Sequence, residues 1–225
     1  MGKNKLRRFQ ENRCLSNVIQ PTRQEVLSGF QLKGRWRDKF FGNTRPIILE
    51  LGCGKGEYVV GMGKVFPEKN FIGLDIKGAR LWFGAKEAVG ESLGNVAFLR
   101  THIELLDLLF DENEVDEIWI TFPDPQIKHK RMKHRLTCPY FLEKYRKILR
   151  PRGVIHLKTD SEFLYGYTLG LLQGLGHEII TAHHDIYGAR EYEPSTPYLR
   201  EIKTYYELLF FAGGKPITYV KFRLG

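Results

Sequence analysis

Short apolar runs alternate along most of the chain with stretches whose apolar residues recur every three or four positions. The apolar runs, which predict strands, lie at residues 46–51, 70–76, 95–100, 114–122 and 154–158. The stretches with helical spacing, which predict helices, lie at residues 57–65, 78–89, 139–149 and 163–175. Strands that alternate with helices in this way predict an α/β fold around a mostly parallel sheet.

The two ends of the chain have weaker patterns. Residues 178–183 predict another strand, and a proline-containing loop follows at 188–200. Beyond it, apolar or alternating runs at 205–211 and 217–224 flank Ala-Gly-Gly-Lys-Pro, which predicts a hairpin and an antiparallel edge to the sheet. Residues 1–45 predict a partly ordered basic arm with a short helix near 24–30, followed by one α/β domain over residues 46–225.

Composition adds the first information about partners. The chain has 225 residues, 42% of them hydrophobic, which is enough for a real core and excludes a wholly disordered protein. The net charge of +9 is concentrated, because residues 1–45 carry +8, residues 126–135 carry +5 and the rest sums to −4. This clustering favours a polyanionic partner such as nucleic acid or a membrane surface, with solubility alone as the alternative.

Cysteine use and hydropathy indicate the cellular compartment that we expect for the protein. Cys14, Cys53 and Cys138 form no CxxC pair and no metal-ligand spacing, so we expect reduced thiols, no metal and a cytoplasmic protein. No apolar run reaches the length of about 18 residues that a membrane span needs, and the N-terminus lacks the apolar region of a signal peptide. The sequence leaves the choice between monomer and homodimer open.

A glycine-rich turn follows the first predicted strand and reads Glu50-Leu-Gly52-Cys-Gly54-Lys-Gly56. Glycines there let the backbone turn tightly and approach a ligand. The dinucleotide pattern GxGxxG fails at Glu57, and no GKS or GKT follows as in a P-loop. Asp75 ends the second strand, where a carboxylate can accept hydrogen bonds from ribose hydroxyls. The pattern predicts a nucleoside-type pocket, with a ligand-free tight turn as the alternative.

A second motif, Phe122-Pro-Asp-Pro125, follows the fourth predicted strand. The two prolines restrict the backbone around Asp124 and aim it at the carboxyl end of the sheet, where α/β enzymes bind ligands. Residues 126–135, here called the basic segment, come next and read QIKHKRMKHR. Cations beside an active-site rim suit phosphate binding. The alternatives are a turn-forming aspartate and a solvated loop.

The glycine turn and the two strand-end acids together resemble the class I S-adenosylmethionine-dependent methyltransferases. The ordered motifs resemble one family more closely, the bacterial tRNA (guanine-N(7)-)-methyltransferases, from about residue 45 to the end. These motifs are ELGCGKG, GLDI, FPDP with its basic segment, HLKTD at 156–160 and TYYE at 204–207. The resemblance implies a Rossmann-like, doubly wound, three-layer α/β/α fold with a mostly parallel seven-stranded sheet and an antiparallel C-terminal edge. It also implies S-adenosylmethionine as cofactor and tRNA as substrate.

The resemblance also assigns roles to individual residues. The positions that match its cofactor pocket are Glu50, Gly52, Gly54, Asp75, Thr101 and Asp124, and Asp124 also matches its catalytic aspartate. The positions that match its substrate contacts are Lys128, Lys130, Arg131, Lys133, His134, Arg135, Asp160, Thr204 and Glu207. Two departures stand out: Gln126 replaces the usual tryptophan, and Thr101 stands where an aspartate is frequent.

The chemistry of guanine explains why carboxylates suit such a site. The N-7 atom is a lone-pair nucleophile without a proton, so the enzyme mainly has to position the base and stabilise charge. Asp160 and Glu207 fit the donor edge of guanine, but Asp160 also fits a helix cap and Glu207 a strand-edge charge. Asp124 fits either base reading or charge stabilisation. A methyltransferase of another RNA or of protein, an NAD(P)-dependent oxidoreductase and a non-enzymatic RNA-binding module remain the competing functions.

Overall fold

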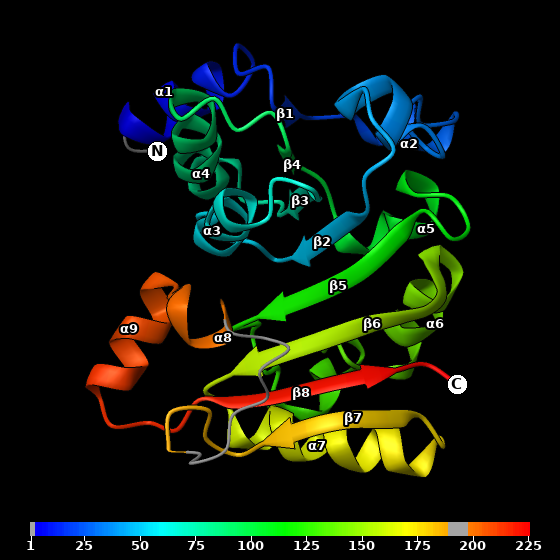
Figure 1. Ribbon diagram of the computed structural model, residues 1–225, viewed down its shortest axis with the longest axis vertical. Coiled ribbons are helices and arrows are strands. Elements are labelled where there is room, and N and C mark those ends of the chain that lie inside the picture. Colours follow the sequence, from blue (N-terminus) through cyan, green and yellow to red (C-terminus); the bar gives the residue numbers. More distant parts are fainter. Residues whose placement is uncertain (1–2, 189–197) are drawn as a thin grey trace.

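The computed structural model describes residues 3–188 and 198–225, which form one mixed sheet with helices on both faces (Figure 1). The strand order is β1-β4-β3-β2-β5-β6-β8-β7. The strands are β1 Val18–Ile19, β2 Ile47–Leu51, β3 Asn70–Leu74, β4 Val96–Leu99, β5 Val115–Thr121, β6 Leu149–Thr159, β7 Glu178–His183 and β8 Thr218–Arg223. The six strands from β1 to β6 pair in parallel, whereas β8 runs antiparallel to both β6 and β7. The predicted antiparallel C-terminal edge is therefore confirmed.

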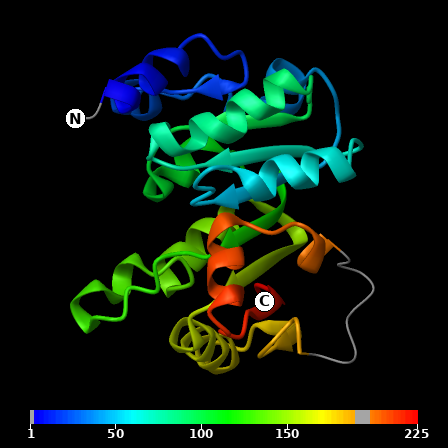
Figure 2. The same ribbon diagram turned by 90° about the vertical axis from the view of Figure 1, so that its left-hand side faces the viewer.

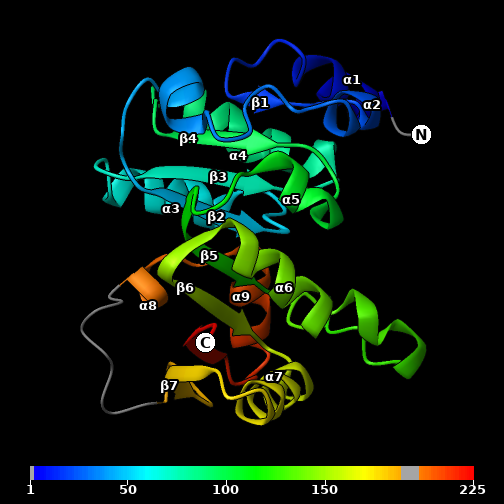
Figure 3. The same cartoon turned by 90° about the vertical axis from the view of Figure 1, so that its right-hand side faces the viewer.

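The helices fall into two layers that face separate apolar clusters. One layer holds α3 Glu57–Val65, α4 Gly78–Gly90, α8 Tyr198–Glu201 and α9 Tyr205–Ala212, and α1 Lys3–Glu11 packs on α4. The other holds α2 Arg23–Leu27, α5 Leu106–Leu109, α6 Pro139–Ile148 and α7 Glu162–Gly174. Figure 2 faces α3, α4 and α9, and Figure 3 faces α5 and α6 on the opposite side. This is the three-layer α/β/α arrangement that the family resemblance implies.

Strand β2 shows why the central strands read as unbroken apolar runs. Successive side chains of a strand point to opposite faces, and helices cover both faces of this sheet. Ile47 and Leu49 belong to the cluster under α5 and α6, whereas Ile48 belongs to the cluster under α3 and α4. Glu50 is 1% exposed and follows Ile48 on that second face, so the alternation itself buries a carboxyl group under the glycine turn.

The first 45 residues contribute to the sheet and to the core. Strand β1 pairs with β4 and adds an eighth strand to the expected seven. The pattern missed it because only two residues form it. Trp36 is fully buried, stacks on Phe110 with ring centroids 5.4 Å apart, and donates its indole N–H to the Leu109 carbonyl. The predicted helix near 24–30 is present as α2. The role of these residues as a separate basic arm toward RNA stays a prediction.

The predicted hairpin strand at 205–211 is wrong, because this segment forms helix α9. Thr204 caps the helix: its hydroxyl accepts a hydrogen bond from the Glu207 amide at 3.1 Å, and the Glu207 carboxylate accepts one from the Thr204 amide at 3.4 Å. This reciprocal cap starts a helix even though tyrosine and phenylalanine favour strands. Most of the predicted loop at 188–200 lies outside the described residues, and its far end forms α8.

Candidate active site

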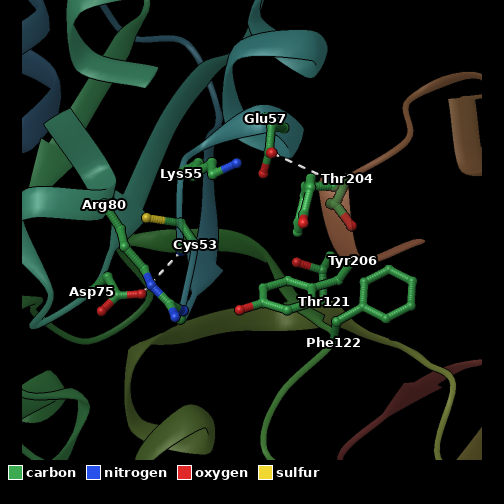
Figure 4. Close-up of a pocket in the computed structure, with 12 residues that line it drawn as sticks. Cys53, Lys55, Glu57, Asp75, Arg80, Thr121, Phe122, Thr204 and Tyr206 are labelled. Atoms are coloured by element: carbon green, nitrogen blue, oxygen red, sulfur yellow. Dashed lines mark hydrogen bonds between the residues drawn. The ribbon is translucent and has the colours of Figure 1, made fainter. Parts of the chain in front are cut away.

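A cavity of about 160 Å³ opens at the carboxyl ends of the central parallel strands (Figure 4). Its walls come from the turn after β2, the end of β3, the end of β5 and the start of α9. The lining residues are Gly52, Cys53, Gly54, Lys55, Glu57, Asp75, Arg80, Thr121, Phe122, Thr204, Tyr205 and Tyr206. Ligands of open α/β sheets bind at this edge, so the position agrees with the sequence prediction.

The glycine turn has the shape of a cradle. Gly52 and Gly54 have φ angles of 74° and 58°, in the region that side chains disfavour. A Cβ atom on Gly52 would meet no atom within 4 Å, and one on Gly54 would only just reach the Gly52 carbonyl, so a side chain here would occupy cavity space. Gly56 is different, because a Cβ there would lie 2.5 Å from the Phe98 ring. The first two glycines keep the cavity open, whereas the third permits close packing.

Asp75 lies opposite this turn with its carboxylate oriented by two backbone amides. Its Oδ2 accepts a hydrogen bond from the Gly54 amide at 3.0 Å, and its Oδ1 accepts one from the Lys77 amide at 2.7 Å. Each carboxylate oxygen has a second lone pair, so the group can still accept hydrogen bonds from a diol. This geometry suits the ribose contact predicted for Asp75.

A second cavity of about 610 Å³ begins at the next residue, Ile76. Arg100, Thr101 and His102, which follow β4, contribute to its wall. Thr101 is buried and lies where the cofactor family often has an aspartate. The predicted cofactor residue Thr101 therefore belongs to the adjoining cavity, on the far side of Asp75 from the glycine turn. A volume of several hundred Å³ is typical of small-molecule sites.

Glu50 lies beneath the glycine turn and does not line the cavity. The Thr121 hydroxyl donates a hydrogen bond to its Oε1, while its Oε2 has no partner among the described residues. Burial raises the pKa of Glu50 to about 8, although the bond from Thr121 acts in the opposite direction. Glu50 is therefore protonated at neutral pH and presents a neutral carboxyl group to this part of the site.

The backbone around Asp124 is held in an unusual conformation. Phe122 and Gln126 both have φ of 47°, which is rare for residues other than glycine. Asp124 is exposed, and its Oδ1 accepts a hydrogen bond from the Gln126 amide at 3.0 Å. The turn-forming role considered for Asp124 is thus present. Asp124 lies outside the cavity lining, two residues beyond Phe122, and its catalytic role stays a prediction.

The basic segment projects from the body of the molecule and contains a short 3-10 helix, His129–His134 (Figure 2). The exposed members among its predicted RNA contacts are Lys128, Lys130, Arg131, Lys133 and His134. Arg135 is the exception, since only 6% of it is exposed. The segment therefore presents several cations to solvent but keeps its last one inside.

The remaining predicted substrate residues lie on two different elements. Asp160 follows β6 and lies 3.5 Å from the Lys215 ammonium group. It is not the cap of the next helix, because Ser161 caps α7 by accepting the Leu164 amide at 3.2 Å. Thr204 lines the cavity at the start of α9.

Glu207 is completely buried on the inner side of α9. Its Oε1 lies 2.7 Å from the Lys158 ammonium and accepts a hydrogen bond from the Tyr187 hydroxyl at 2.7 Å. The strand-edge alternative for Glu207 is wrong, since the residue belongs to a helix. Burial lowers the pKa of Lys158 to about 8, while Glu207 acts in the opposite direction. The predicted guanine contact of Glu207 stays a prediction, and the structure also shows that its carboxylate fastens α9 to the sheet.

The sequence analysis missed Lys158, Thr121, Arg80 and Tyr206. Lys158 stands inside HLKTD and Thr121 directly precedes FPDP, so both were close to recognised motifs. Their roles depend on partners that are distant in the sequence, because Lys158 pairs with Glu207 and Thr121 donates to Glu50. Arg80 and Tyr206 line the cavity from α4 and α9. Arg80 belongs to no recognised motif, whereas Tyr206 stands inside TYYE but was given no role of its own.

The glycine cradle, the oriented aspartate beside it and the parallel sheet define a Rossmann-like α/β protein with a candidate ligand site at the carboxyl edge of its sheet. A family model described as "Putative methyltransferase" matches residues 44–219. The chain belongs to the tRNA (guanine-N(7)-)-methyltransferase family, which confirms the resemblance drawn from its motifs.

Relatives with this name cover nearly the whole chain. The protein of Christiangramia forsetii is 60% identical over 99% of both chains. That of Porphyromonas gingivalis is 55% identical over 90% of this chain and 81% of its own. That of Bacteroides thetaiotaomicron is 48% identical over 100% of this chain and 87% of its own.

Solved structures share the fold at much lower identity. The structure titled as the 16S rRNA methyltransferase KamB has a TM-score of 0.60 at 13% identity and covers 82% of this chain and 90% of its own. The structure of an antibiotic-related methyltransferase has a TM-score of 0.59 at 15% identity and covers 92% of this chain and 96% of its own. Within the described part of the chain, every helix is too short or too polar to cross a bilayer.

Proposed function

We propose that this protein transfers a methyl group from S-adenosylmethionine to N-7 of a guanine in tRNA, in the cytoplasm. The observation that carries the proposal is the identity of 60%, over 99% of both chains, with a protein named for this reaction. The cavity supports it, because a cradle of two open glycines and an oriented aspartate lie at the ligand-binding edge of the sheet.

The residues of the site fit the proposed cofactor. The backbone at Gly52 and Gly54 leaves room for close approach, and Asp75 can accept the ribose hydroxyls. Thr101 lines the adjoining cavity, to which we assign the adenine base. The unpartnered Oε2 of Glu50 marks a polar position below the turn. S-adenosylmethionine supplies an electrophilic methyl group on a sulfonium.

The chain then has to hold guanine in line with that methyl group. No proton must leave N-7 before attack, so orientation and charge stabilisation supply most of the catalytic effect. Asp124 is exposed two residues beyond Phe122, which lines the cavity, and we assign to its negative charge the stabilisation of the positive charge that develops on the methylated ring. Asp160 and Thr204 offer acceptors for the base edge, with Glu207 behind Thr204.

Exposed cations of the basic segment suit the tRNA backbone. The exposed cations follow Asp124 in the chain and are Lys128, Lys130, Arg131, Lys133 and His134. Each phosphate contact made by such a cation adds to the salt dependence of binding but carries no sequence information. This division leaves recognition of the guanine to the carboxylates.

The decisive experiment supplies methyl-labelled S-adenosylmethionine with unmodified tRNA transcripts and identifies the labelled nucleoside by mass spectrometry. The expected product is 7-methylguanosine. A matched transcript containing 7-deazaguanosine lacks the acceptor nitrogen and should take up no label. Label in a 16S rRNA fragment but not in tRNA would assign the chain to another RNA, and label in another nucleoside would reject the proposed position.

A further inference from the structure

Arg135 ends the basic segment but does not share the environment of its other cations. It is 6% exposed, whereas Lys130, Arg131 and Lys133 are exposed to solvent. Burying a guanidinium is costly unless its donors and its charge find partners. The location of those partners therefore indicates what this side chain does.

The partners of Arg135 lie at the beginning of the same segment. Its Nε and Nη2 both donate to the Gln126 carbonyl at 3.2 Å, and Nη2 also donates to the Ile127 carbonyl at 3.4 Å. One side chain thus joins the two ends of a ten-residue loop, 126–135. Loops of this length whose ends are held together are compact units.

Two aromatic side chains of helix α7 pack against the guanidinium of Arg135. The Arg135 Cζ atom lies 4.8 Å from the ring centroid of Phe163 and 4.4 Å from that of Tyr167. Guanidinium groups stack on aromatic faces while their edge donates hydrogen bonds, which an ammonium group cannot do. The next residues are also fastened, since the Tyr145 hydroxyl donates to the Leu136 carbonyl at 2.8 Å. Arg135 is therefore a fixed point on the α6 and α7 layer.

Gln126 links this fixed point to Asp124. Its carbonyl accepts the hydrogen bonds from Arg135, and its own amide donates to Asp124 Oδ1 at 3.0 Å. Its φ of 47° is held between these two contacts. A shift of the Gln126 backbone would therefore change the direction of the Asp124 carboxylate.

We propose that Arg135 is a positioning residue that closes the basic segment on α7 and orients Asp124 through Gln126, and that it contacts no tRNA phosphate. The proposal rests on the proposed function for its catalytic consequence, but not for the closed loop itself. It separates the basic segment into exposed cations that face the RNA and one buried cation that shapes the loop.

The test compares R135Q, R135K and F163A with K133Q in the full-length protein. Salt dependence of tRNA binding separates the two roles, because loss of one phosphate contact lowers the slope of log K against log salt by about 0.7–0.9. K133Q should lower the slope by this amount, whereas R135Q should leave it unchanged. At saturating tRNA, R135Q and F163A should lower kcat about 10-fold or more, since misplacement near 1 Å costs up to about 100-fold.

R135K and F163A keep the proposal testable if R135Q does not fold. R135K retains the charge, so a phosphate contact predicts rescue, whereas a positioning role predicts a kcat as low as that of R135Q. F163A leaves the charge of Arg135 in place and removes only one of the two rings that pack against it. If Arg135 contacted a phosphate, kcat would therefore not change. A lower salt slope in R135Q with kcat retained in R135K and F163A would overturn the proposal.

Amide hydrogen exchange tests the closed loop without any substrate. Peptides covering residues 126–134 should exchange at least 10-fold faster in R135Q and F163A than in the wild-type protein, and K133Q should match the wild type. Equal exchange in all four proteins would overturn the closure. If the wild type methylates no guanine, the proposed function fails, while the exchange result still decides whether Arg135 closes the loop.

Discussion

Lys158 and Glu207 form an ion pair in which neither side chain has any exposed surface, with Nζ 2.7 Å from Oε1. Lys158 comes from β6 and Glu207 from α9, so the pair connects the sheet to the helix that begins at the cavity. The same ammonium donates to the Leu199 carbonyl of α8 at 2.5 Å. A single buried cation therefore fixes both C-terminal helices of this face.

Replacing Lys158 by methionine should destabilise the protein by about 3–5 kcal/mol, because the Glu207 charge would stay buried without its partner. The double variant K158M/E207Q should lose less than the sum of the two single variants. Urea unfolding of all four proteins measures this coupling. K215M serves as the control, since its exposed pair with Asp160 should contribute less than about 1 kcal/mol. If the losses in free energy of unfolding of the two single variants add up to the loss of the double variant, the two residues are not coupled.

The pKa of Glu50, raised by burial to about 8, predicts a specific pH dependence of stability. Between pH 5 and 8 the folded state keeps this proton while the unfolded state has lost it, so stability falls as pH rises through this window. E50Q removes the effect. The difference in free energy of unfolding, E50Q minus wild type, should therefore increase by about 1 kcal/mol per pH unit from pH 5 to 8. Parallel curves for the two proteins would show that Glu50 titrates normally.

Asp124 should be essential for turnover but not for folding. Asparagine keeps the oxygen that accepts the Gln126 amide and removes the charge, so D124N should unfold at the wild-type denaturant concentration within about 0.5 kcal/mol. Its kcat should fall at least about 100-fold, as expected for loss of charge stabilisation at the reacting atoms. Single-turnover methyl transfer provides the measurement, with E112Q as a matched change at an exposed carboxylate. A kcat within threefold of the wild type would remove Asp124 from the catalytic assignment.

Alanine at Gly52 should affect both stability and cofactor binding. The φ of 74° costs a residue with a Cβ about 1–2 kcal/mol, and the added methyl would enter the cavity. Calorimetric titration with S-adenosylhomocysteine should show at least about 10-fold weaker binding. The control is G170A in α7, where the added Cβ meets no atom within 4 Å and helix propensity should raise stability by about 0.5–1 kcal/mol. Equal affinity in G52A and the wild type would place the ligand elsewhere.

The central sheet was predictable because both of its faces are buried. Strand β2 has no exposed residue, so its run from Ile47 to Leu51 stands out from the polar turns around it. The glycine turn and Asp75 were predictable for a related reason, since backbone geometry and a strand-end acid are local features. Their contact, between the Gly54 amide and Asp75, follows once β2 and β3 are neighbours.

Other features depend on contacts that no local pattern shows. Tyr205–Ala212 contains several aromatic residues and resembles a strand, yet the cap between Thr204 and Glu207 makes it a helix. Arg135 resembles its cationic neighbours in sequence, and its contacts with the Gln126 and Ile127 carbonyls and with the rings of α7 distinguish it from them. The burial of Lys158 could not be predicted either, because the carboxylate that allows it comes from a helix that is distant in the sequence.

The two-residue strand β1 determines whether β4 is an open edge of the sheet. The Phe98 amide of β4 donates to the carbonyl of Asn17, just before β1, and the Arg100 amide, just after β4, donates to the carbonyl of Ile19 within β1. Without residues 1–45, β4 would be an open sheet edge with unpaired backbone groups, and such edges recruit strands from other molecules. By pairing with β4, residues 1–45 therefore cover a sheet edge that would otherwise favour aggregation, independently of any role of their positive charge.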